Sequence, residues 1–493
     1  MIRSSTSSCS FASVTQKGRE EQQAWATLRF RQRLRPVRAL RHLLASECRS
    51  LCEAVAGDLG KSSEETLAGE LLPLAAACRF LERAAPRILQ PRRVARRHLP
   101  LWLWPQSDTV YRRPRGLVGI IGTWNYPLLL NGVQIVQALA AGNSVLWKPS
   151  ELAPSSAKVF FDLLGRAGFP PGLVQLLPAT RAAGEALADA DIDHIVFTGS
   201  SATGRRLAEH LGRRLVTSTL ELSGCDALFV LEDADVNLAA RAAWFGATLN
   251  RGQTCLASRR ILVHRSLYET FADVLRPLSS AAAPMRLALE AQVKQAEHLV
   301  RDALAGGARL LQTPRPAERG GDPSLYLPAV VLDARPEMAL CQQASFAPLM
   351  AVLPFGTLEE ALRMDAQCPY ALGASIFTSD PARAMQLADH LRAGSVALND
   401  IVLPTVHPAT PFGGRGESGW GVTQGAEGLL EMTVPQVVSV RGGKMRPHYG
   451  TAIGKPPLSA EGLRGLLEWS HAATLRQRLA GLWQFLRAAK PSR

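Results

Sequence analysis

The sequence predicts an α/β fold built on parallel sheets, and two observations carry this prediction. First, short apolar runs alternate with segments of helix length, as in Gly116–Gly122, Val133–Ala141 and Ser144–Lys148. Strands of this kind are buried in a parallel sheet by helices on both of its faces. Second, a chain of 493 residues is too long for one ordinary core, so we expect two domains, with room for a small appendage.

The N-terminal quarter is expected to be mostly helical. Residues 1–18 begin with a serine-rich stretch and are expected to be disordered. Apolar residues at helical spacing predict a long amphipathic helix or a helix pair over 20–59, and a second helical stretch over 63–89. The basic segment 91–105, which contains Trp102 and Trp104, is punctuated by prolines and is expected to cross the surface.

Two series of strands and helices follow this helical region. The expected strands of the first series are 116–122, 144–148, 192–197 and 227–231, with helices over 133–141 and 155–167. A second series is expected after Cys255, with strands over 260–263 and 349–353. The sequence shows no internal repeat.

The tail beyond Gly442 is rich in proline and then helical. Five apolar residues fall on one face of the predicted helix, and its basic residues lie mostly elsewhere: Leu475, Leu479, Leu482, Trp483 and Leu486 against Arg476, Arg478, Arg487 and Lys490. A basic amphipathic helix with a tryptophan can lie in a membrane interface. It can equally pack on its own protein or on a partner subunit.

The composition is that of a globular enzyme, with 47% hydrophobic and 20% charged residues. The net charge of +14 comes mainly from arginine, and basic residues cluster over 29–41 and 87–97. Such clusters attract anionic surfaces or form solvated helix faces, and no specific nucleic-acid partner is expected. The eight cysteines form no CxxC pair, which argues against disulfides and a metal site and favours a reducing compartment. Because neither a signal peptide nor a membrane-spanning run is evident, the expected location is cytoplasmic.

Cys255 is the candidate nucleophile of the chain. It follows polar residues and Gly252, a setting that suits a tight loop presenting the side chain. A thiolate is a strong nucleophile when its neighbours lower its pKa or a base accepts its proton. A cysteine in a globular chain is more often a small buried hydrophobe, so the interpretation depends on the other polar residues that follow the strands.

Four groups of residues near expected strand ends can support such a nucleophile. Asn125 follows the first strand and can donate its amide to an oxyanion, and Glu221 can act as a general base. Lys148, Ser150 and Glu151 follow the next strand, where a lysine and a carboxylate can hold ribose hydroxyls. Glycine marks the start of the helix after the third strand, where backbone N–H groups can approach a pyrophosphate; the residues are Gly199, Ser200 and Gly204.

Taken together, these residues make the chain resemble the aldehyde dehydrogenase superfamily, from about Glu20 to Val440. The motifs that carry the resemblance are Trp124–Pro127, Lys148–Glu151, Phe197–Ser200, Glu221–Gly224, Gly252–Cys255 and Pro411–Gly414. Lys148 follows Asn125 by 23 positions and Cys255 follows Glu221 by 34, as the family leads us to expect. The form of the first motif and of Gly421–Gly425 looks most like the class 3 branch, which includes enzymes for fatty and aromatic aldehydes.

The resemblance implies a role for each of these residues. Cys255 would form a thiohemiacetal and then a thioester, with the oxyanion held by Asn125 and the Cys255 N–H, and Glu221 would activate the hydrolytic water. The implied cofactor is NAD, because the carboxylate of Glu151 disfavours the 2′-phosphate of NADP. Class 3 relatives can use both, so NADP is also possible. The implied cofactor site comprises Trp124, Lys148, Ser150, Glu151, Gly199, Ser200, Gly204, Leu222 and Phe346.

The resemblance also implies the organisation of the chain. A Rossmann-like NAD(P)-binding domain would span 19–222, with an arm segment at about 100–115, and a catalytic domain would span 223–415. Residues 416–442 would form a return and oligomerisation segment that supports a homodimer, and 443–493 would be a tail with the basic amphipathic helix.

The sequence departs from the family pattern at three places. Ala344 stands where the family has a glutamate that holds the nicotinamide ribose, which should loosen the nicotinamide. Ser223 replaces a glycine after the catalytic glutamate, and Cys225 and Asp226 are also unusual there. The segment Leu275–Ala291 is shortened and rich in alanine, which is expected to move a loop of the catalytic domain.

The sequence therefore predicts an enzyme that oxidises an apolar aldehyde, aliphatic or aromatic, with NAD(P)+. Leu129, Leu130 and Val133 follow Asn125 and are expected to line the aldehyde tunnel. One alternative is an acylating enzyme that passes the Cys255 thioester to another acceptor. A second is a low-activity family member that acts as a membrane-docked binding protein, which Ala344 would favour.

Overall fold

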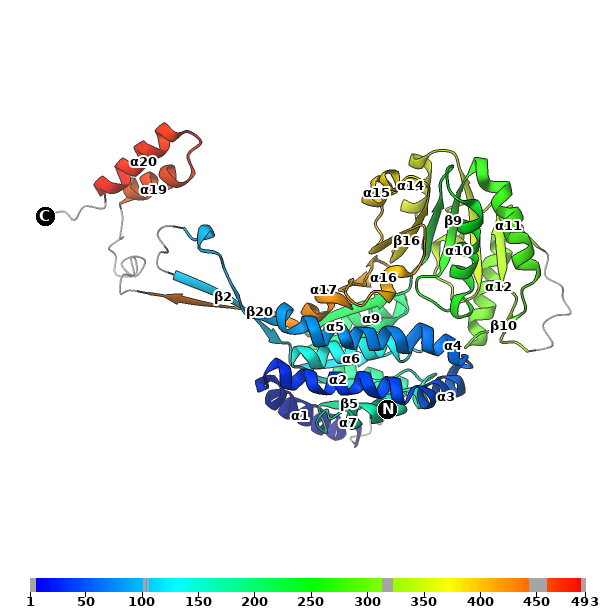
Figure 1. Ribbon diagram of the computed structural model, residues 1–493, viewed down its shortest axis with the longest axis horizontal. Helices are drawn as coiled ribbons and strands as arrows, with labels where there is room; N and C mark the ends of the chain where they lie inside the picture. The colour runs from blue at the N-terminus through cyan, green and yellow to red at the C-terminus, as the bar shows by residue number, and fades with distance from the viewer. Residues whose placement is uncertain (1–5, 101–102, 104–105, 313–321, 443–458, 489–493) are drawn as a thin grey trace. The chain divides into compact units, whose positions relative to one another are not determined.

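The computed structural model describes residues 6–100, 103, 106–312, 322–442 and 459–488 (Figure 1). The chain divides into two compact units. The larger unit comprises Met1–Pro91 and Tyr111–Gln436, and the smaller unit comprises Arg92–Val110 and Val437–Arg493. Each unit is described by itself below.

The chain begins with a series of helices. They are α1 (Thr6–Thr27), α2 (Phe30–Ser46), α3 (Cys48–Leu59), α4 (Ser63–Thr66), the π-helical turn η1 (Leu67–Leu71) and α5 (Leu72–Leu89). Helices α2 and α5 lie side by side (Figure 1), and their apolar faces are buried in the core beneath the first sheet. The helical character predicted for 20–59 and 63–89 is confirmed.

The expected disorder of residues 1–18 is wrong from Thr6 onward, while residues 1–5 lie outside the described residues. Phe11 and Val14 pack against the hydrophobic core of the first sheet. The side-chain amide of Gln175 donates to the carbonyl oxygen of Val14 at 2.9 Å. Two apolar contacts are too few to give a helical periodicity, and the sequence pattern therefore did not indicate this part of the helix.

The first sheet has six strands in the order β19-β7-β6-β3-β4-β5. Their bounds are β3 (Leu117–Ile121), β4 (Ser144–Lys148), β5 (Val174–Leu176), β6 (His194–Gly199), β7 (Thr217–Leu222) and β19 (Gly419–Trp420). The connecting helices are α6 (Leu129–Ala141), α7 (Pro154–Arg166), α8 (Arg181–Asp189) and α9 (Ser201–Arg213). All pairs are parallel except β19 with β7. Because β3 has β4 on one side and β6 on the other, the strand order reverses at β3, where sheets of this kind bind ligands.

The second sheet has seven strands in the order β11-β13-β14-β9-β8-β16-β17. Their bounds are β8 (Asp226–Val230), β9 (Ser258–His264), β11 (Arg309–Leu310), β13 (Ala329–Leu332), β14 (Leu349–Phe355), β16 (Gly373–Phe377) and β17 (Ser395–Leu398). Its helices are α10 (Val236–Thr248), α11 (Tyr268–Ser280), α12 (Glu290–Ala305), α13 (Ala339–Gln342), α14 (Leu358–Ala366) and α15 (Pro381–His390). The predicted boundary at residue 222 falls between the two sheets, although both belong to the larger unit. The α/β fold class with parallel sheets is confirmed.

Several short elements complete the larger unit. They are η4 (Leu249–Gly252), η5 (Arg265–Leu267), β10 (Met285–Arg286), β12 (Leu325–Tyr326), β15 (Tyr370–Ala371), α16 (Leu403–Val406), β18 (Arg415–Gly416) and α17 (Gly425–Glu431). The segment Leu275–Ala291, which we expected to alter a loop, contains the end of α11, strand β10 and the start of α12.

A three-stranded sheet in the order β1-β2-β20 forms the arm. Its strands are β1 (Arg92–Arg93), β2 (Gln106–Pro114) and β20 (Thr433–Arg441). The predicted surface crossing at Trp102 and Trp104 lies outside the described residues. In the tail, the single predicted helix is replaced by two, α19 (Ala460–His471) and α20 (Leu475–Ala488), while 443–458 and 489–493 lie outside the described residues.

Candidate active site

The loop that carries Cys255 has an unusual backbone. Asn250, Arg251 and Gly252 have φ angles of 50°, 61° and 72°, so three consecutive residues are left-handed. A Cβ atom at Gly252 would overlap the carbonyl group of Ala347, and the loop can pass this point only with glycine. Left-handed non-glycine residues store strain that the surroundings must offset. The loop confirms the tight turn expected from the sequence, and it places half-buried Cys255 just before β9.

Buried polar side chains hold this loop in place. The guanidinium of Arg259 donates to the carbonyl oxygens of Thr254 and Gly252 at 3.0 and 3.2 Å. The side-chain amide of Asn250 donates to the carbonyl oxygens of Asn125 and Gln253 at 3.0 and 3.2 Å. The nucleophile loop is therefore tied both to itself and to the segment after β3.

Asn125 lies against the nucleophile loop with its amide fixed in orientation. Its Nδ2 donates to the carbonyl oxygen of Gln253 at 3.0 Å, and its Oδ1 accepts from the hydroxyl of Thr123 at 2.9 Å. The second N–H of the amide has no partner among the described residues and can serve an oxyanion. The structure thus brings Asn125 and Cys255, which are 130 positions apart in the sequence, to one cavity.

A buried ion pair lies beneath Asn125. The ammonium group of Lys61 donates to the carbonyl oxygen of Asn125 at 2.6 Å and to Glu70 at 2.8 Å. The other oxygen of Glu70 accepts from the backbone N–H of Leu128, just before α6, at 2.7 Å. The two charged side chains are only 3% and 0% exposed. Sequence reasoning missed this pair, because Lys61 and Glu70 stand in a stretch that also holds the exposed Glu64 and Glu65, and nothing local marks the two buried charges.

The environment of Cys255 keeps its thiol protonated at neutral pH. Burial raises the pKa of Cys255 to about 12, and the nearby carboxylates of Asp226 and Glu221 raise it further, while Arg259 opposes them. A thiol of this kind becomes a nucleophile only when a base accepts its proton or a positive charge comes close.

Glu221 has the properties of such a base. It lies on β7, and burial raises its pKa to about 7. The hydroxyls of Thr423 and Thr198 donate to its carboxylate and oppose the shift. A carboxyl group with a pKa near neutrality can accept and release a proton at the working pH. Glu221 and Cys255 line the same cavity.

Three cavities meet around these residues. The central cavity, of about 440 Å³, is lined by Asn125, Glu221 and Cys255. It shares Trp124 and Gly199 with a groove of about 710 Å³ along the first sheet. It shares Cys255 with a third, apolar cavity of about 460 Å³. Cys255 therefore lies where the central and apolar cavities adjoin.

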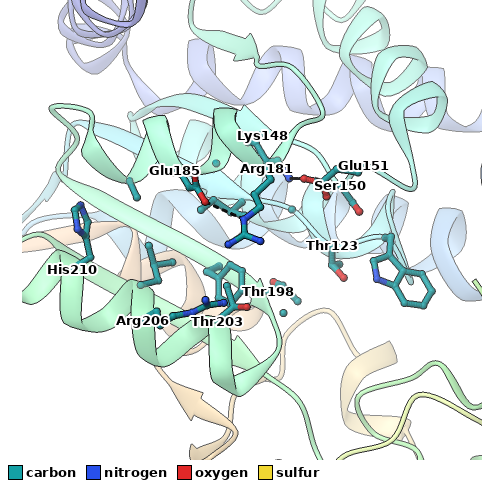
Figure 2. Close-up of a pocket in the computed structure, with 18 of the residues that line it drawn as sticks. Thr123, Lys148, Ser150, Glu151, Arg181, Glu185, Thr198, Thr203, Arg206 and His210 are labelled. Atoms are coloured by element: carbon teal, nitrogen blue, oxygen red, sulfur yellow. Dashed lines mark hydrogen bonds and ion pairs between the residues drawn. The ribbon is translucent and has the colours of Figure 1, made fainter. Parts of the chain in front are cut away.

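The groove follows the strand ends at the reversal point of the first sheet. Lys148 at the end of β4 pairs with Glu151 at 2.5 Å, and Ser150 lies beside them (Figure 2). Although burial opposes ionisation, the hydrogen bond from Lys148 holds the pKa of Glu151 below its ordinary value. Arg181 from α8, which pairs with Glu185, and Arg206 from α9 also line the groove (Figure 2). The sequence analysis did not single out these two arginines, because no motif marks them.

The other predicted cofactor residues take different places. Ser200, Leu222 and Phe346 line the central cavity, where the rings of Phe346 and Trp124 have centroids 6.1 Å apart. Gly204 lines none of the three cavities. A Cβ atom there would lie 2.6 Å from the side chain of Leu222, so this glycine lets α9 pack closely on β7. Its part in a pyrophosphate path stays a prediction.

The departures from the family pattern lie in the central cavity. Ala344 and Ser223 both line it, and the side-chain amide of Gln295 donates to the carbonyl oxygen of Ala344 at 3.2 Å. Glu417 brings a carboxylate to the same cavity and forms an ion pair with Arg205. The sequence analysis missed Glu417, which lies 73 positions from Ala344 and belongs to no motif.

The apolar cavity is lined mainly by side chains without charge. Leu129 and Leu130 contribute as predicted, while Val133 is buried in α6 and does not line it. Lys61 is the one cation among the described residues that line the cavity, and it is already paired with Glu70. The described part of the chain contains no cluster of potential metal ligands.

Known proteins resemble this chain over most of its length. The sequence profile of the aldehyde dehydrogenase family matches residues 4–438. A Methylomonas protein named 4,4′-diapolycopene aldehyde oxidase is 34% identical over 429 residues, which cover 85% of this chain and 79% of the relative. A Mycobacterium bovis protein, provisionally named succinate-semialdehyde dehydrogenase (NADP(+)) 2, is 32% identical and covers 86% of this chain and 83% of its own length.

Solved structures show the same fold. A provisionally named aldehyde dehydrogenase from Burkholderia cenocepacia superposes with a TM-score of 0.83 at 29% identity, covering 90% of this chain and 91% of its own. The NAD+ complex of an aldehyde dehydrogenase from Bacillus cereus superposes with a TM-score of 0.81 at 28% identity, covering 87% and 88%. With this similarity over most of its length, the chain belongs to the aldehyde dehydrogenase family.

Proposed function

We propose that this protein oxidises an apolar, uncharged aldehyde to the carboxylic acid with NAD(P)+, using Cys255 as the nucleophile. The observation that carries the proposal is the position of Cys255, which lines both the apolar cavity and the central cavity that adjoins the groove. An aldehyde whose chain fills the apolar cavity would present its carbonyl carbon to the sulfur, beside the amide of Asn125.

The residues of the groove fit a dinucleotide. Lys148 and Glu151 offer a donor and an acceptor for ribose hydroxyls, and Arg181 and Arg206 offer positive charge to phosphate groups. Trp124 and Phe346 lie where the groove meets the central cavity, and they offer aromatic surface to a nicotinamide ring. When bound there, NAD(P)+ supplies the acceptor for the hydride that leaves the aldehyde carbon.

The side chains of the central cavity supply the acid–base chemistry. Glu221, with its pKa at about 7, accepts the thiol proton of Cys255, and the thiolate adds to the carbonyl carbon. The amide of Asn125 donates to the oxyanion, which stabilises the transition state by about 3 kcal/mol. After oxidation the acyl group is a thioester of Cys255. Glu221 returns its proton to solvent and then takes one from the water that hydrolyses the thioester.

The charges of the apolar cavity select the substrate class. A succinate semialdehyde would need a cation for its carboxylate, and Lys61 is bound to Glu70 and to the carbonyl oxygen of Asn125. Glu64 and Glu65 also line this cavity and would repel an anion. The names of two relatives, one for diapolycopene aldehyde and one from Pseudomonas aeruginosa provisionally for coniferyl aldehyde, denote substrates without a carboxylate. An apolar aliphatic or aromatic aldehyde therefore fits best.

The decisive experiment compares two aldehydes of opposite character. Purified protein with NAD+ or NADP+ is expected to reduce the cofactor with octanal and to act far more slowly on succinate semialdehyde. Cys255→Ser should abolish the reaction. A preference for succinate semialdehyde would overturn the assignment of the substrate class. Hydrolysis of an aryl ester by Cys255 without cofactor reduction by any aldehyde would favour an acyl-transfer function, which the missing carboxylate at Ala344 makes the second candidate.

The predicted homodimer is proposed to form through the arm. Strand β20 lies at the edge of its sheet, and its valines Val437 and Val440 are each 61% exposed. An exposed apolar edge strand pairs readily with another chain. Sedimentation of the native protein should give the mass of two chains, and Val438→Pro should shift it towards one. A mass of one chain for the native protein would contradict the dimer.

A further inference from the structure

Most of the net charge of this protein belongs to the smaller unit. Arg92–Val110 and Val437–Arg493 carry fourteen Lys and Arg residues against three Asp and Glu, a net charge of +11 in 76 residues. The whole chain has a net charge of +14, so the remaining 417 residues contribute only +3. A concentration of charge of this size in an appendage attracts an anionic partner.

The described end of the tail is a hairpin of α19 and α20, which lie side by side (Figure 1). The helices meet through two glycines: a Cβ atom at Gly465 would lie 2.5 Å from the backbone nitrogen of Phe485, and one at Gly481 would lie 2.5 Å from that of Trp469. The rings of Trp469 and Phe485 stack with centroids 6.2 Å apart. The hairpin is thus closed by its small residues and one aromatic pair.

The large apolar side chains of the hairpin face away from this contact. Both helices expose leucines at helical spacing, and the exposed residues are Leu463, Leu467, Leu475, Leu479, Trp483 and Leu486, at 53–72%. Arginines stand among them, with the guanidinium of Arg487 lying 3.8 Å from the ring centroid of Trp483. Arg464, Arg476 and Arg478 are also exposed. A stripe of leucine and tryptophan flanked by arginine is the composition of helices that lie in the interface of a bilayer.

We propose that the α19–α20 hairpin docks this enzyme on the surface of an anionic phospholipid bilayer. The apolar stripes would enter the boundary between headgroups and acyl chains, while the arginines bind lipid phosphates. No described helix is long and apolar enough to cross a membrane. The hairpin lies beyond residue 438, where the match to the family ends.

A second copy of the chain is a poorer occupant for this surface. Arg464, Arg476, Arg478 and Arg487 stand among the exposed leucines of the hairpin, and a second hairpin would bring the same arginines against them. The sequence of the arm points to the same lipid partner, because Arg92, Arg93, Arg96 and Arg97 are followed by a stretch with two tryptophans. Tryptophan is enriched at the interface between membrane and water.

Flotation of the full-length protein with vesicles tests the proposal. The protein is expected to float with vesicles of 70% phosphatidylcholine and 30% phosphatidylglycerol, and to bind at least tenfold more weakly to pure phosphatidylcholine. Leu479→Glu combined with Trp483→Glu should lower binding at least tenfold, because both side chains are exposed and carry the apolar stripe of α20. Arg464→Glu combined with Arg476→Glu should do the same on the anionic vesicles, since each basic residue near such a surface strengthens binding about fivefold.

The matched control is Met385→Glu combined with Leu238→Glu, which introduces the same two charges at sites 57% and 46% exposed in the larger unit. This variant should bind vesicles as the native protein does, and all variants should keep the native rate of octanal oxidation in solution. Equal binding to both kinds of vesicle, or unchanged binding of the Leu479 and Trp483 variant, would overturn the proposal. A third outcome would also overturn it: the native protein does not bind vesicles but forms a dimer, and the Leu479 and Trp483 variant is a monomer. The hairpin would then bind a second copy of the chain.

Discussion

The two sides of Cys255 differ in how firmly the chain holds them. On the nucleophile side, the buried pair of Lys61 and Glu70 supports the carbonyl oxygen of Asn125, and Arg259 binds the carbonyl oxygens of the loop. On the cofactor side, Ala344 offers no charged group, and the carboxylate of Glu417 is partly exposed and paired with Arg205.

This difference shows which part of the reaction the chain preorganises. Attack and oxyanion stabilisation need donors fixed within a fraction of an ångström, and buried groups provide that. Cofactor binding tolerates looser contacts, because a dinucleotide makes many of them. We therefore expect substitutions on the nucleophile side to change the chemical step strongly, and substitutions on the cofactor side to have moderate effects.

The largest effect is expected for Asn125→Ala. Loss of the amide donor should lower kcat for octanal oxidation about 100-fold or more. Alkylation of Cys255 by iodoacetamide forms no oxyanion, so its rate should stay close to that of the native protein. A parallel loss in both reactions would show that Asn125 merely shapes the loop.

Lys61→Met comes next and tests the support beneath Asn125. We expect kcat to fall about tenfold with little change in KM for the cofactor, since the carbonyl oxygen of Asn125 loses its partner at 2.6 Å. Breaking one half of a buried ion pair should also lower the free energy of unfolding by about 3 kcal/mol.

Lys158→Met on α7 is the matched control. Its ion pair with Asp162 is exposed, so its loss should change stability by less than about 0.5 kcal/mol and leave kcat unaltered. If Lys61→Met destabilises the protein while kcat holds, Lys61 has a structural role alone.

Features that a local run of residues or a motif determines could be predicted from the sequence. Strand β4 has the bounds expected for it, because a run of buried apolar residues determines a parallel strand locally. Asn125, Glu221 and Cys255 could be named because motifs mark them, and the structure places them in one cavity.

Lys61, Glu70 and Arg259 could not be named. Lys61 and Glu70 act through partners that only the folded chain brings near, Asn125 across 64 positions and Leu128 across 58. Arg259 binds carbonyl oxygens of its own loop, but its burial is not visible in the sequence. Lysine, glutamate and arginine usually lie at the surface, but here their burial lets them hold Asn125 and the nucleophile loop in place. Burial of a charged side chain is a property of tertiary structure. The same holds for the start of α1, whose order depends on contacts with the first sheet.

On the cofactor side, Ala344→Glu should improve the enzyme. A restored carboxylate can hold ribose hydroxyls, and we expect kcat/KM for NAD+ to rise about three- to tenfold. Glu417→Gln, alone and combined with Ala344→Glu, tests whether Glu417 takes the place of the missing carboxylate. If Glu417 already holds the cofactor, its loss weakens binding and Ala344→Glu compensates for it. An unchanged kcat/KM in Ala344→Glu would mean that the missing carboxylate does not weaken the binding of the cofactor.

The smallest effect is expected for Thr423→Val, which alters the base shared by both sides. The Thr423 hydroxyl donates to the Glu221 carboxylate and opposes the effect of burial, which together with this opposition leaves the pKa at about 7. Without this donor the pKa rises, so the ionised base is lost at a higher pH. The acid limb of the pH profile of kcat should therefore move up by as much as about one unit, the equivalent of one hydrogen bond. The rate falls severalfold near pH 6.5 and is unchanged at pH 9.

Thr410→Val is the control for this shift, because its hydroxyl donates to the carbonyl oxygens of Pro404 and His407 and not to Glu221. An acid limb that stays in place in Thr423→Val would mean that Glu221 does not set the pH dependence. The base would then have to be sought elsewhere in the cavity, and Glu417, a second carboxylate that lines it, would be the next residue to replace.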